Sequence, residues 1–571
     1  MDLIYIDPPF ATGADFSFIA AVGDETFTKT PSIIEQKAYR DTWGRGLDGY
    51  LCWFYETVAL LHELLSEEGS IYVHCDWHVN SAIRHVLDEV FGPDRFQSEI
   101  IWKRKDANKA GTTLSVVTDT IFFYSKSEKP IWNHPFVPHT EERIQRAYGN
   151  TESDGRQYAL ADLMAPGDRK GTKADYEWNG VRPRAGRHWS YTLEKMQDLE
   201  AAGRILWNSR GIPKLKIYLD ESKGSPLSNL WADIAMVKGG TEATSYATQK
   251  PEALLERIIK ASSNEGDLVL DCFCGSGTTA AVAERLGRRW LTCDLGRFAI
   301  HTTRKRLLAI ENVRPFVVQN LGKYERQVWQ RAEFGAEAEA IVDTYRRFIL
   351  DLYHAEPLAG YTWLHGKKGG RLVHVGTVDT PITAADVQQM AIEFRRLVGA
   401  GENLPRQAGI DVLGWDFALE LNETARQVAQ SAGLSVRFVR IPREVLEKKA
   451  VEQGDIAFFE LAALAVEATV RRRTVTVALT DFMVPPDDVP ADVIKAVKKW
   501  SEWIDYWAVD FDYRDDTFHN EWQSYRTRKD RALQLRVTHE YDQPGCYTVV
   551  VKAIDILGND TTKALTVTIP A

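Results

Sequence analysis

Short, uninterrupted apolar runs alternate with amphipathic segments through the first 130 residues. The first run is Leu3–Ile6 (LIYI), and a second lies within GSIYVHCD at residues 69–76. Runs of this length without strict alternation are typical of parallel strands that are covered on both faces. Between the two runs, apolar residues recur at helical spacing from Trp53 to Leu65. The pattern therefore predicts an α/β sheet that begins with the first residues of the chain.

This α/β pattern stops and later restarts. Two more strands are predicted in SEIIWKR and TDTIFFYSK, and residues 133–235 then become rich in Trp, Arg, Gly and Pro without regular alternation. Farther on, LVLDCFCGSGTTAAVAERLG predicts a strand, a glycine turn and a helix, and RRWLTCDLG predicts another strand that ends in Asp294. We expect one sheet built from two halves, residues 1–132 and 236–321, with 133–235 inserted between them.

The last 250 residues follow a different plan. Residues 322–470 predict a helical and α/β accessory region, and residues 471–571 predict a β-rich domain. In the stretch EYDQPGCYTVVVKAIDILGNDTTKALTVTI, apolar residues alternate from Tyr547 to Ala553 and LGND supplies a turn, which together favour a hairpin. The stretch is similar to the last strands of a PKD-like, immunoglobulin-type sandwich, although another β fold also fits.

Composition narrows the cellular setting. The six cysteines are sparse for 571 residues and show no C-x-x-C spacing, so neither a disulfide framework nor a zinc site is indicated. We expect no metal. No signal-peptide pattern or long apolar stretch is present, which favours a cytoplasmic protein without a membrane segment.

Charge is distributed unevenly along the chain. The formal net charge is −10, yet residues 101–330 contain 35 Lys and Arg against 27 Asp and Glu, whereas residues 1–100 contain 6 against 17. Clusters such as Lys103-Arg104-Lys105 and Arg182/Arg184/Arg187 are able to neutralise phosphates. An acidic total therefore does not exclude a nucleic acid as partner.

Asp7 to Phe10, DPPF, follows the first predicted strand directly. Ligands bind beyond the carboxyl ends of strands in open α/β sheets, and two prolines stop the strand and hold the turn rigid. A carboxylate and an aromatic ring on such a turn predict a functional site.

A second candidate site is the turn DCFCGSGTT, Asp271 to Thr279. Glycines between a strand and a helix let a ligand approach the backbone N–H groups at the helix start. Asp294, about twenty residues farther on, suits the hydroxyls of a ribose. This arrangement predicts a nucleoside cofactor, and since Gly275, Gly277 and Ala280 also satisfy G-x-G-x-x-A, a nicotinamide-dependent oxidoreductase stays open here.

Together, DPPF and D-x-F-x-G-x-G-T resemble the amino-methyltransferases of DNA. Their order along the chain is similar to that of the β-class, and YATQKPEALLERII and DTIFFYSKS are similar to modification subunits of type III restriction systems. The resemblance covers about residues 1–330. It implies a Rossmann-like, S-adenosylmethionine-dependent methyltransferase sheet in which 133–235 is the target-recognition insert.

The resemblance also implies roles for individual residues. Asp7 and the carbonyl of Pro8 would accept the amine hydrogens of the target base, Pro9 would keep the turn rigid, and Phe10, where the family more often has Tyr, would stack on a base extracted from the duplex. Asp7 must then fold beside the Gly275 turn. The implied cofactor-binding residues are His74, Asp76, Thr248, Gln249, Lys250, Pro251, Asp271, Phe273, Gly275, Gly277, Thr278 and Asp294.

The expected activity is methyl transfer to the N6 amine of adenine in double-stranded DNA. An N4-cytosine methyltransferase and a DNA-binding or assembly subunit with a degenerate site remain alternatives. An ATP-dependent restriction subunit and a second copy of the chain are candidate partners. Members of the class usually carry a strand and helix ahead of DPPF, whereas this chain begins within the strand that DPPF ends. We expect this difference to leave a sheet edge uncovered and the pocket partly open.

Overall fold

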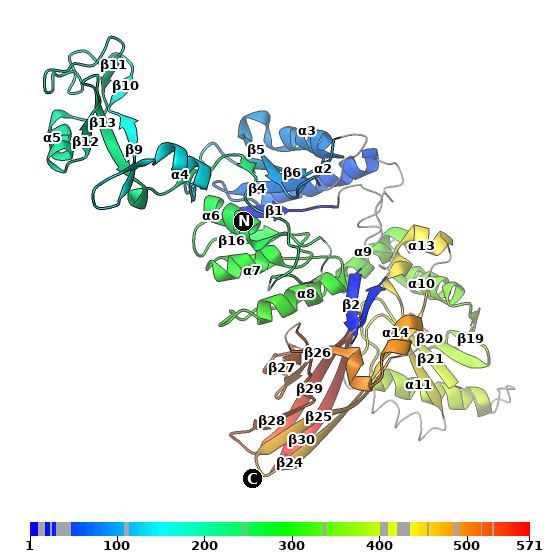
Figure 1. Cartoon of the computed structure of the whole chain (residues 1–571). Helices are drawn as coiled ribbons and strands as arrows, with labels where there is room; N and C mark the ends of the chain where they lie inside the picture. The colour runs from blue at the N-terminus through cyan, green and yellow to red at the C-terminus, as the bar shows by residue number, and fades with distance from the viewer. Residues whose placement is uncertain are drawn as a thin grey trace. The chain divides into compact units, whose positions relative to one another are not determined.

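The structure is a computed structural model of the chain (Figure 1). It divides into two compact units: unit 1 comprises Met1–Pro130, Ala232–Ile259 and Asn264–Ala571, and unit 2 comprises Ile131–Trp231 and Lys260–Ser263. The residues that it describes are 1–9, 18–22, 25–29, 47–107, 114–240, 242–244, 246, 248–334, 338–399, 409–418, 434–453, 456–484, 489, 491–514, 517–527 and 530–570.

A mixed sheet forms the centre of the N-terminal part of unit 1. The strands that unit 1 contributes to it follow the order β5-β6-β4-β1-β16-β17. β1 is parallel to both β4 and β16, and β16 is parallel to β17, whereas β6 is antiparallel to β4 and to β5. Every residue of β1 and β4 is buried, as the apolar runs predicted. The strands are β1 (Leu3–Ile6), β4 (Ser70–Cys75), β5 (Phe96–Lys103), β6 (Thr118–Ser125), β16 (Leu268–Asp271) and β17 (Arg289–Thr292).

Helices α2 and α3 cover one face of this sheet. The predicted helix from Trp53 to Leu65 largely coincides with α2, which begins earlier and ends at Leu64. Phe54, Val58 and Leu61 of α2 join Ile4 and Ile71 of the strands in one core. The helices of this part are α2 (Leu47–Leu64), α3 (Asn80–Phe91), α6 (Glu252–Ser262), α7 (Thr278–Arg285) and α8 (Arg297–Leu308). A hairpin of β2 (Phe18–Val22) and β3 (Glu25–Lys29) comes after β1.

Unit 2 has a small core of its own. Leu163, Trp178, Trp189 and Met196 pack together, so these two tryptophans stabilise the insert and do not face solvent. Its main sheet has the order β12-β13-β9-β8. The elements are β7 (Phe136–Val137), α4 (Glu141–Ala147), β8 (Asn150–Thr151), β9 (Gln157–Asp162), β10 (Met164–Pro166), β11 (Arg187–Trp189), α5 (Leu193–Ala201), β12 (Ile205–Trp207), β13 (Pro213–Tyr218), β14 (Ser225–Pro226) and β15 (Leu230–Trp231).

The accessory region after α8 is an α/β sheet with the order β18-β19-β20-β21-β22-β23. Consecutive residues of β20, Leu372 and Val373, enter different cores, so apolar side chains cover both faces. Its elements are α9 (Gly322–Phe334), α10 (Ala338–Leu352), β18 (Glu356–Pro357), β19 (Gly366–Lys368), β20 (Arg371–Val375), α11 (Ala384–Gly399), β21 (Gly409–Gly414), β22 (Ser435–Arg440), α13 (Lys448–Gln453) and β23 (Phe459–Glu460).

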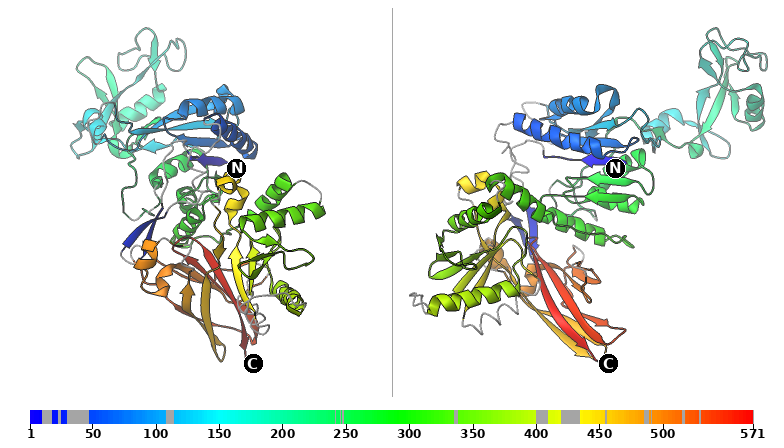
Figure 2. Two further views of the ribbon diagram at one scale, coloured as in Figure 1. Left: turned by 90° about the vertical axis from the view of Figure 1, so that its right-hand side faces the viewer. Right: turned by 180° about the vertical axis from the view of Figure 1, so that it is seen from behind.

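The C-terminal strands form two sheets, β24-β25-β28 and β27-β26-β29-β30, drawn in orange to red in Figure 2. Val477 of one and Trp507 and Val551 of the other share one core, which makes this region a β-sandwich. The hairpin expected around LGND is confirmed by the antiparallel pairing of β29 and β30. The first of these strands begins at Ala463, before the expected boundary at 471. The elements of this region are β24 (Ala463–Arg471), β25 (Thr474–Met483), α14 (Ala491–Ala496), β26 (Ile504–Asp510), β27 (Trp522–Tyr525), β28 (Arg536–Glu540), β29 (Gly545–Asp555) and β30 (Asp560–Ile569).

Among the residues described above, no helix is both long and apolar enough to cross a membrane.

Candidate active site

Asp7 and the glycine turn lie at the same edge of the central sheet. β1 and β16 are parallel neighbours in which Ile4 pairs with Leu270, so the carboxyl ends of both strands lie at one edge. Asp7 comes directly after β1, and the turn that contains Gly275 comes directly after β16. Two segments that are far apart in the sequence are thus adjacent in space.

The two carboxylate oxygens of Asp7 have different surroundings. Oδ2 forms an ion pair with Nζ of Lys250, and both side chains are largely buried. Oδ1 is buried and has no hydrogen-bond partner among the described residues. A buried acceptor without a donor is costly, so an additional donor at Oδ1 would be stabilising. Pro8 is buried and Pro9 half-buried, while Phe10 lies outside the described residues.

The segment before α6 is shaped by Gln249. Its Oε1 accepts hydrogen bonds from the backbone N and the Oγ1 of Thr244, both at 2.8 Å, and its Nε2 donates to the carbonyl of Glu242 at 2.7 Å. This side chain therefore holds the loop that presents Lys250. Thr248 is half-buried and Pro251 is buried.

The glycine turn uses backbone conformations that favour glycine. Gly275 and Gly277 have φ angles of 48° and 71°. A Cβ on Gly277 would lie 2.6 Å from the side chain of Thr303 on α8, closer than carbon atoms approach. Thr278 at the start of α7 donates from Oγ1 to the carbonyl of Lys250 at 3.1 Å, which joins this turn to the Asp7–Lys250 pair.

Asp271 holds the glycine turn from inside. Its Oδ1 accepts from the backbone N of Phe273 at 3.0 Å, and its Oδ2 accepts from Oγ1 of Thr279 at 2.5 Å. Burial raises the pKa of Asp271 to about 7, and the charges of Asp7 and Asp294 add to this rise, while the two hydrogen bonds oppose it. Phe273 itself packs against the α2 core, with its ring 5.7 Å from that of Trp53.

Asp294 caps two backbone groups at the same edge. Its Oδ2 accepts from the N of Gly275 at 2.9 Å, and its Oδ1 accepts from the N of Gly296 at 2.8 Å. The side chain is half-buried, and a carboxylate oxygen is able to accept more than one hydrogen bond. Asp294 thus fixes the turn from a position that a ligand is able to reach.

His74 and Asp76 are placed differently from each other. His74 is fully buried within the sheet, where Nδ1 meets the hydroxyl of Tyr5 at 2.9 Å and Nε2 meets Oδ2 of Asp119 at 3.3 Å. The sequence predicts it near the cofactor at a strand end, but both ring nitrogens have protein partners. Asp76 lies just after β4 and accepts from the backbone N and Nδ1 of His78 at 3.0 and 2.6 Å.

Three residues that support the glycine turn escaped the sequence analysis. The ring of Tyr246 lies 3.1 Å from where a Cβ of Gly275 would be. Thr303 donates from Oγ1 to the carbonyl of Gly275 at 3.2 Å, and Arg306 donates to Oγ1 of Thr278 at 2.8 Å. Tyr246 is the first residue of the matched stretch YATQKPEALLERII, but Thr303 and Arg306 had no signal other than their place on a helix.

The model of the family described as DNA methylase matches residues 1–305, more than half of the chain. Over 307 residues the chain is 36% identical to the type II methyltransferase M.EcaI of Enterobacter cloacae, covering 53% of this chain and 64% of the relative. It is 28% identical to the StyLTI Mod subunit of the type III restriction-modification enzyme of Salmonella typhimurium, covering 49% of this chain and 46% of the relative. The chain therefore spans less than two thirds of the length of either.

Among solved structures, the M1.HpyAVI–SAM complex aligns with a TM-score of 0.26 and 17% identity, covering 54% of this chain and 89% of that one. The PKD1 domain of the Vibrio cholerae metalloprotease PrtV aligns with a TM-score of 0.13 and 16% identity, covering 19% of this chain and 98% of that domain.

The raised pKa of Asp271 predicts a pH-dependent stability. Between its ordinary value of 3.8 and about 7 the unfolded chain ionises this carboxyl while the folded chain keeps it protonated, so folding stability falls as pH rises through this range and levels off above 7. Relative to Asp271→Asn, the wild type should lose roughly 3 kcal/mol between pH 5 and 7.5. Urea unfolding of both proteins at each pH measures this difference, and parallel curves would contradict it.

Gly277→Ala should lower the stability of the protein by more than the cost of its left-handed backbone conformation alone. Gly266 has a φ of 85° and open space around its Cβ position, so Gly266→Ala carries the left-handed penalty of about 1–2 kcal/mol without a collision. Gly277→Ala adds the contact with Thr303, at about 1–3 kcal/mol more. Gly277→Ala should therefore have a lower melting temperature than Gly266→Ala. Equal melting temperatures would show that the turn or Thr303 shifts to accommodate the methyl group.

Proposed function

Because the chain belongs to the DNA methylase family, we propose that it transfers a methyl group from S-adenosylmethionine to the N6 amine of adenine in double-stranded DNA. The observation that carries this proposal is the parallel pairing of β1 with β16, which sets the carboxylate of Asp7 beside the glycine turn. A dinucleotide-dependent oxidoreductase, which the turn alone left open, would give DPPF no role.

Asp7 suits the amine of a nucleobase. The lone pair of an adenine N6 amine is delocalised into the ring, and an acceptor on each N–H favours a nitrogen that keeps its lone pair free for reaction. Oδ1 of Asp7 supplies one acceptor, since it is buried and lacks a partner among the described residues, and the carbonyl of Pro8 supplies the other. Lys250 holds the opposite oxygen, so the carboxylate cannot rotate freely.

S-adenosylmethionine supplies, when bound, a methyl group that is already activated by a positive sulfur. The task of the protein is then mainly alignment, which is worth up to about 7–11 kcal/mol. The residues at this edge suit such a cation: Asp7 and Asp294 are acidic, and the glycines keep side chains away from the turn. The same site would be bordered by Thr248, Gln249 and Pro251. Asp76 would border it from the end of β4, the parallel neighbour of β1.

Adenine is favoured over cytosine by Asp at position 7, which is a habit of the family and not a geometric requirement. N4-cytosine methylation uses the same acceptors, so it stays the first alternative. A subunit that binds DNA but has lost activity is the second. Digesting DNA that has been incubated with the protein and S-adenosylmethionine, and identifying any modified nucleoside, distinguishes adenine methylation, cytosine methylation and the absence of activity.

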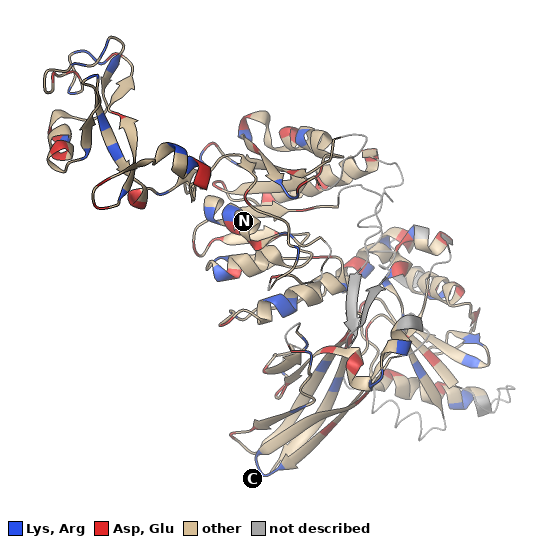
Figure 3. Cartoon of the chain, in the orientation of Figure 1, with Lys and Arg blue, Asp and Glu red and all other residues tan. Residues whose placement is uncertain are grey.

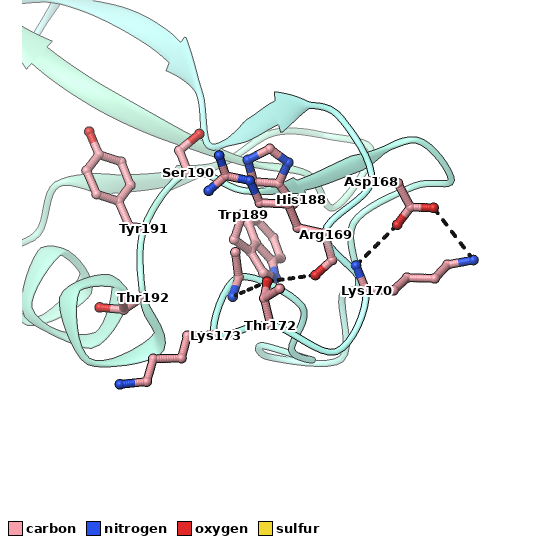
Figure 4. A pocket seen from close by; sticks show the side chains of 11 residues that line it. Asp168, Arg169, Lys170, Thr172, Lys173, His188, Trp189, Ser190, Tyr191 and Thr192 are labelled. Carbon is pink, nitrogen blue, oxygen red and sulfur yellow. Dashed lines mark hydrogen bonds and ion pairs between the residues drawn. The ribbon is translucent and has the colours of Figure 1, made fainter.

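We propose that unit 2, which contains the predicted target-recognition insert, contacts DNA. A cavity of about 620 Å³ lies on this unit, bordered by Arg169, Lys170, Lys173, His188 and Tyr191 (Figure 4). Arg169 and Lys173 are exposed and have no acidic partner among the described residues. Such cations bind phosphates, and they position a protein on DNA without reading its sequence. The similarity to a type III Mod subunit makes an ATP-dependent restriction subunit a candidate partner; a second copy of the chain is another.

Asp7→Ala should lower methyl transfer at least about 100-fold while S-adenosylmethionine still binds. Asp7→Asn, which keeps the shape but not the charge, should show whether the carboxylate itself is needed. Asp2→Asn is the control, because Asp2 lies at the opposite end of the same strand and bonds Ser66 and Leu268. Tritiated methyl transfer to DNA and calorimetry measure both properties, and full turnover by Asp7→Ala would refute the assignment.

The double variant Arg169→Ala/Lys173→Ala should weaken DNA binding without changing sequence preference. Each lost phosphate contact removes about one unit from the slope of log K against log salt, so the slope should fall by about 2. Lys195→Ala is the matched control, because Lys195 is exposed on α5 but lies 3.9 Å from Asp198. An unchanged slope would show that Arg169 and Lys173 do not contact DNA phosphates.

A further inference from the structure

Helix α8 contacts the glycine turn with one side and the C-terminal sandwich with the other. At 100° per residue, positions 299, 303 and 306 lie on one side of a helix and positions 301, 304, 305 and 308 lie on the opposite side. Figure 3 marks the basic positions of this helix. The contacts of the two sides lead to different parts of unit 1.

The first side is locked to the turn. Thr303 and Arg306 donate to groups of the turn, as described above, and Arg306 also forms an ion pair with Glu252 at 2.7 Å. Gly277 packs so closely on Thr303 that not even a methyl group fits between them. A shift of α8 must therefore shift the turn.

The second side is anchored to strand β26 by Asp505. Its Oδ2 lies 2.7 Å from Nε2 of His301 and 2.7 Å from Nζ of Lys305. Burial would raise the pKa of Asp505, but the hydrogen bond from His301 and the charge of Lys305 lower it to about 2. The carboxylate is thus charged at neutral pH and bridges two residues one turn apart on α8.

Apolar contacts accompany this bridge. Leu308 packs against the sandwich cluster of Tyr506, Ala508 and Ile554. The guanidinium of Arg304 lies 5.9 Å from the ring of Tyr506. All four positions on this side of α8 therefore meet the sandwich.

A second route joins the sandwich to the turn at the start of α8. The Cβ position of Gly558, in the turn between β29 and β30, lies 3.6 Å from Cα of Phe298. The ring of Phe298 stacks on Tyr246, with centroids 6.3 Å apart, and Tyr246 covers Gly275. Both ends of α8 therefore contact the glycine turn, directly or through Tyr246, on one side and the C-terminal sandwich on the other.

We propose that Asp505 is a positioning residue for the cofactor turn, acting through α8, so that docking of the sandwich and binding of S-adenosylmethionine are coupled. The inference rests on the proposed function, because it takes the turn to be the cofactor site. Coupling of this kind is reciprocal: if the docked sandwich raises affinity for the cofactor, the bound cofactor stabilises the docked sandwich by the same free energy. The sandwich is then part of the methyltransferase and not only an appended module.

The test compares full-length Asp505→Asn with wild type. The dissociation constant for S-adenosylmethionine should rise about 10-fold, with kcat at saturating cofactor changed less than about 2-fold. Asp505→Glu, which keeps the charge, should recover part of the affinity. Asp411→Asn is the control, because Asp411 is buried and bridges Arg371 and Arg437 in the accessory region, away from α8. It should lose stability but keep cofactor affinity.

Hydrogen exchange supplies a readout that a general loss of stability would not imitate. Adding S-adenosylmethionine to the wild type should slow amide exchange across Ile504–Asp510, and Asp505→Asn should abolish this protection. If the wild type binds no S-adenosylmethionine, the proposed function fails and the inference with it. If the wild type binds but Asp505→Asn binds within 2-fold and retains the protection, only the coupling is wrong.

Discussion

The parallel pairing of β1 between β4 and β16 is the constraint on which the candidate site depends. Because the register is Ile4 with Leu270 and Ile4 with Ile71, the ends of three strands meet at one edge. Side chains alternate between faces along a strand, so a slip of one residue would turn Asp7 and its neighbours to the wrong faces. The completely buried residues of β1 and β4 oppose such a slip, since it would exchange well-packed apolar contacts on both faces.

Three acidic side chains meet at this edge of the sheet. Asp7, Asp271 and Asp294 are close enough for the first and last to raise the pKa of the middle one. Lys250 balances Asp7, while Asp294 is held by backbone N–H groups and Asp271 by Thr279 and Phe273. Three carboxylates thus have three different environments. This division separates Asp7, whose Oδ1 has no partner among the described residues, from two carboxyl groups that hold the glycine turn in shape.

The regions outside the central sheet have unequal relations to it. Unit 2 has an independent core in which Trp178 and Trp189 are structural, so its surface cations are better candidates for DNA contact than these tryptophans. The sandwich, by contrast, shares partly buried polar contacts with α8. Deleting one partner of such an ion pair leaves the other charge uncompensated, which makes these contacts effective for fixing a geometry even where their net contribution to stability is small.

The sequence by itself determined where the strands end and where backbone must approach a ligand, because apolar runs, prolines and glycines act through local sterics and burial. It therefore predicted the strand that ends before Asp7, the turn that contains Gly275, the second half of the sheet and the last hairpin. Only the tertiary structure decided what each polar side chain contacts. His74 has its partners in Tyr5 and Asp119, Lys250 meets Asp7 from 243 residues away, and Thr303 and Arg306 reach the turn from a helix without a motif. Hydrogen bonds depend on positions in space, and those positions are set by the packing of segments that the linear pattern does not relate.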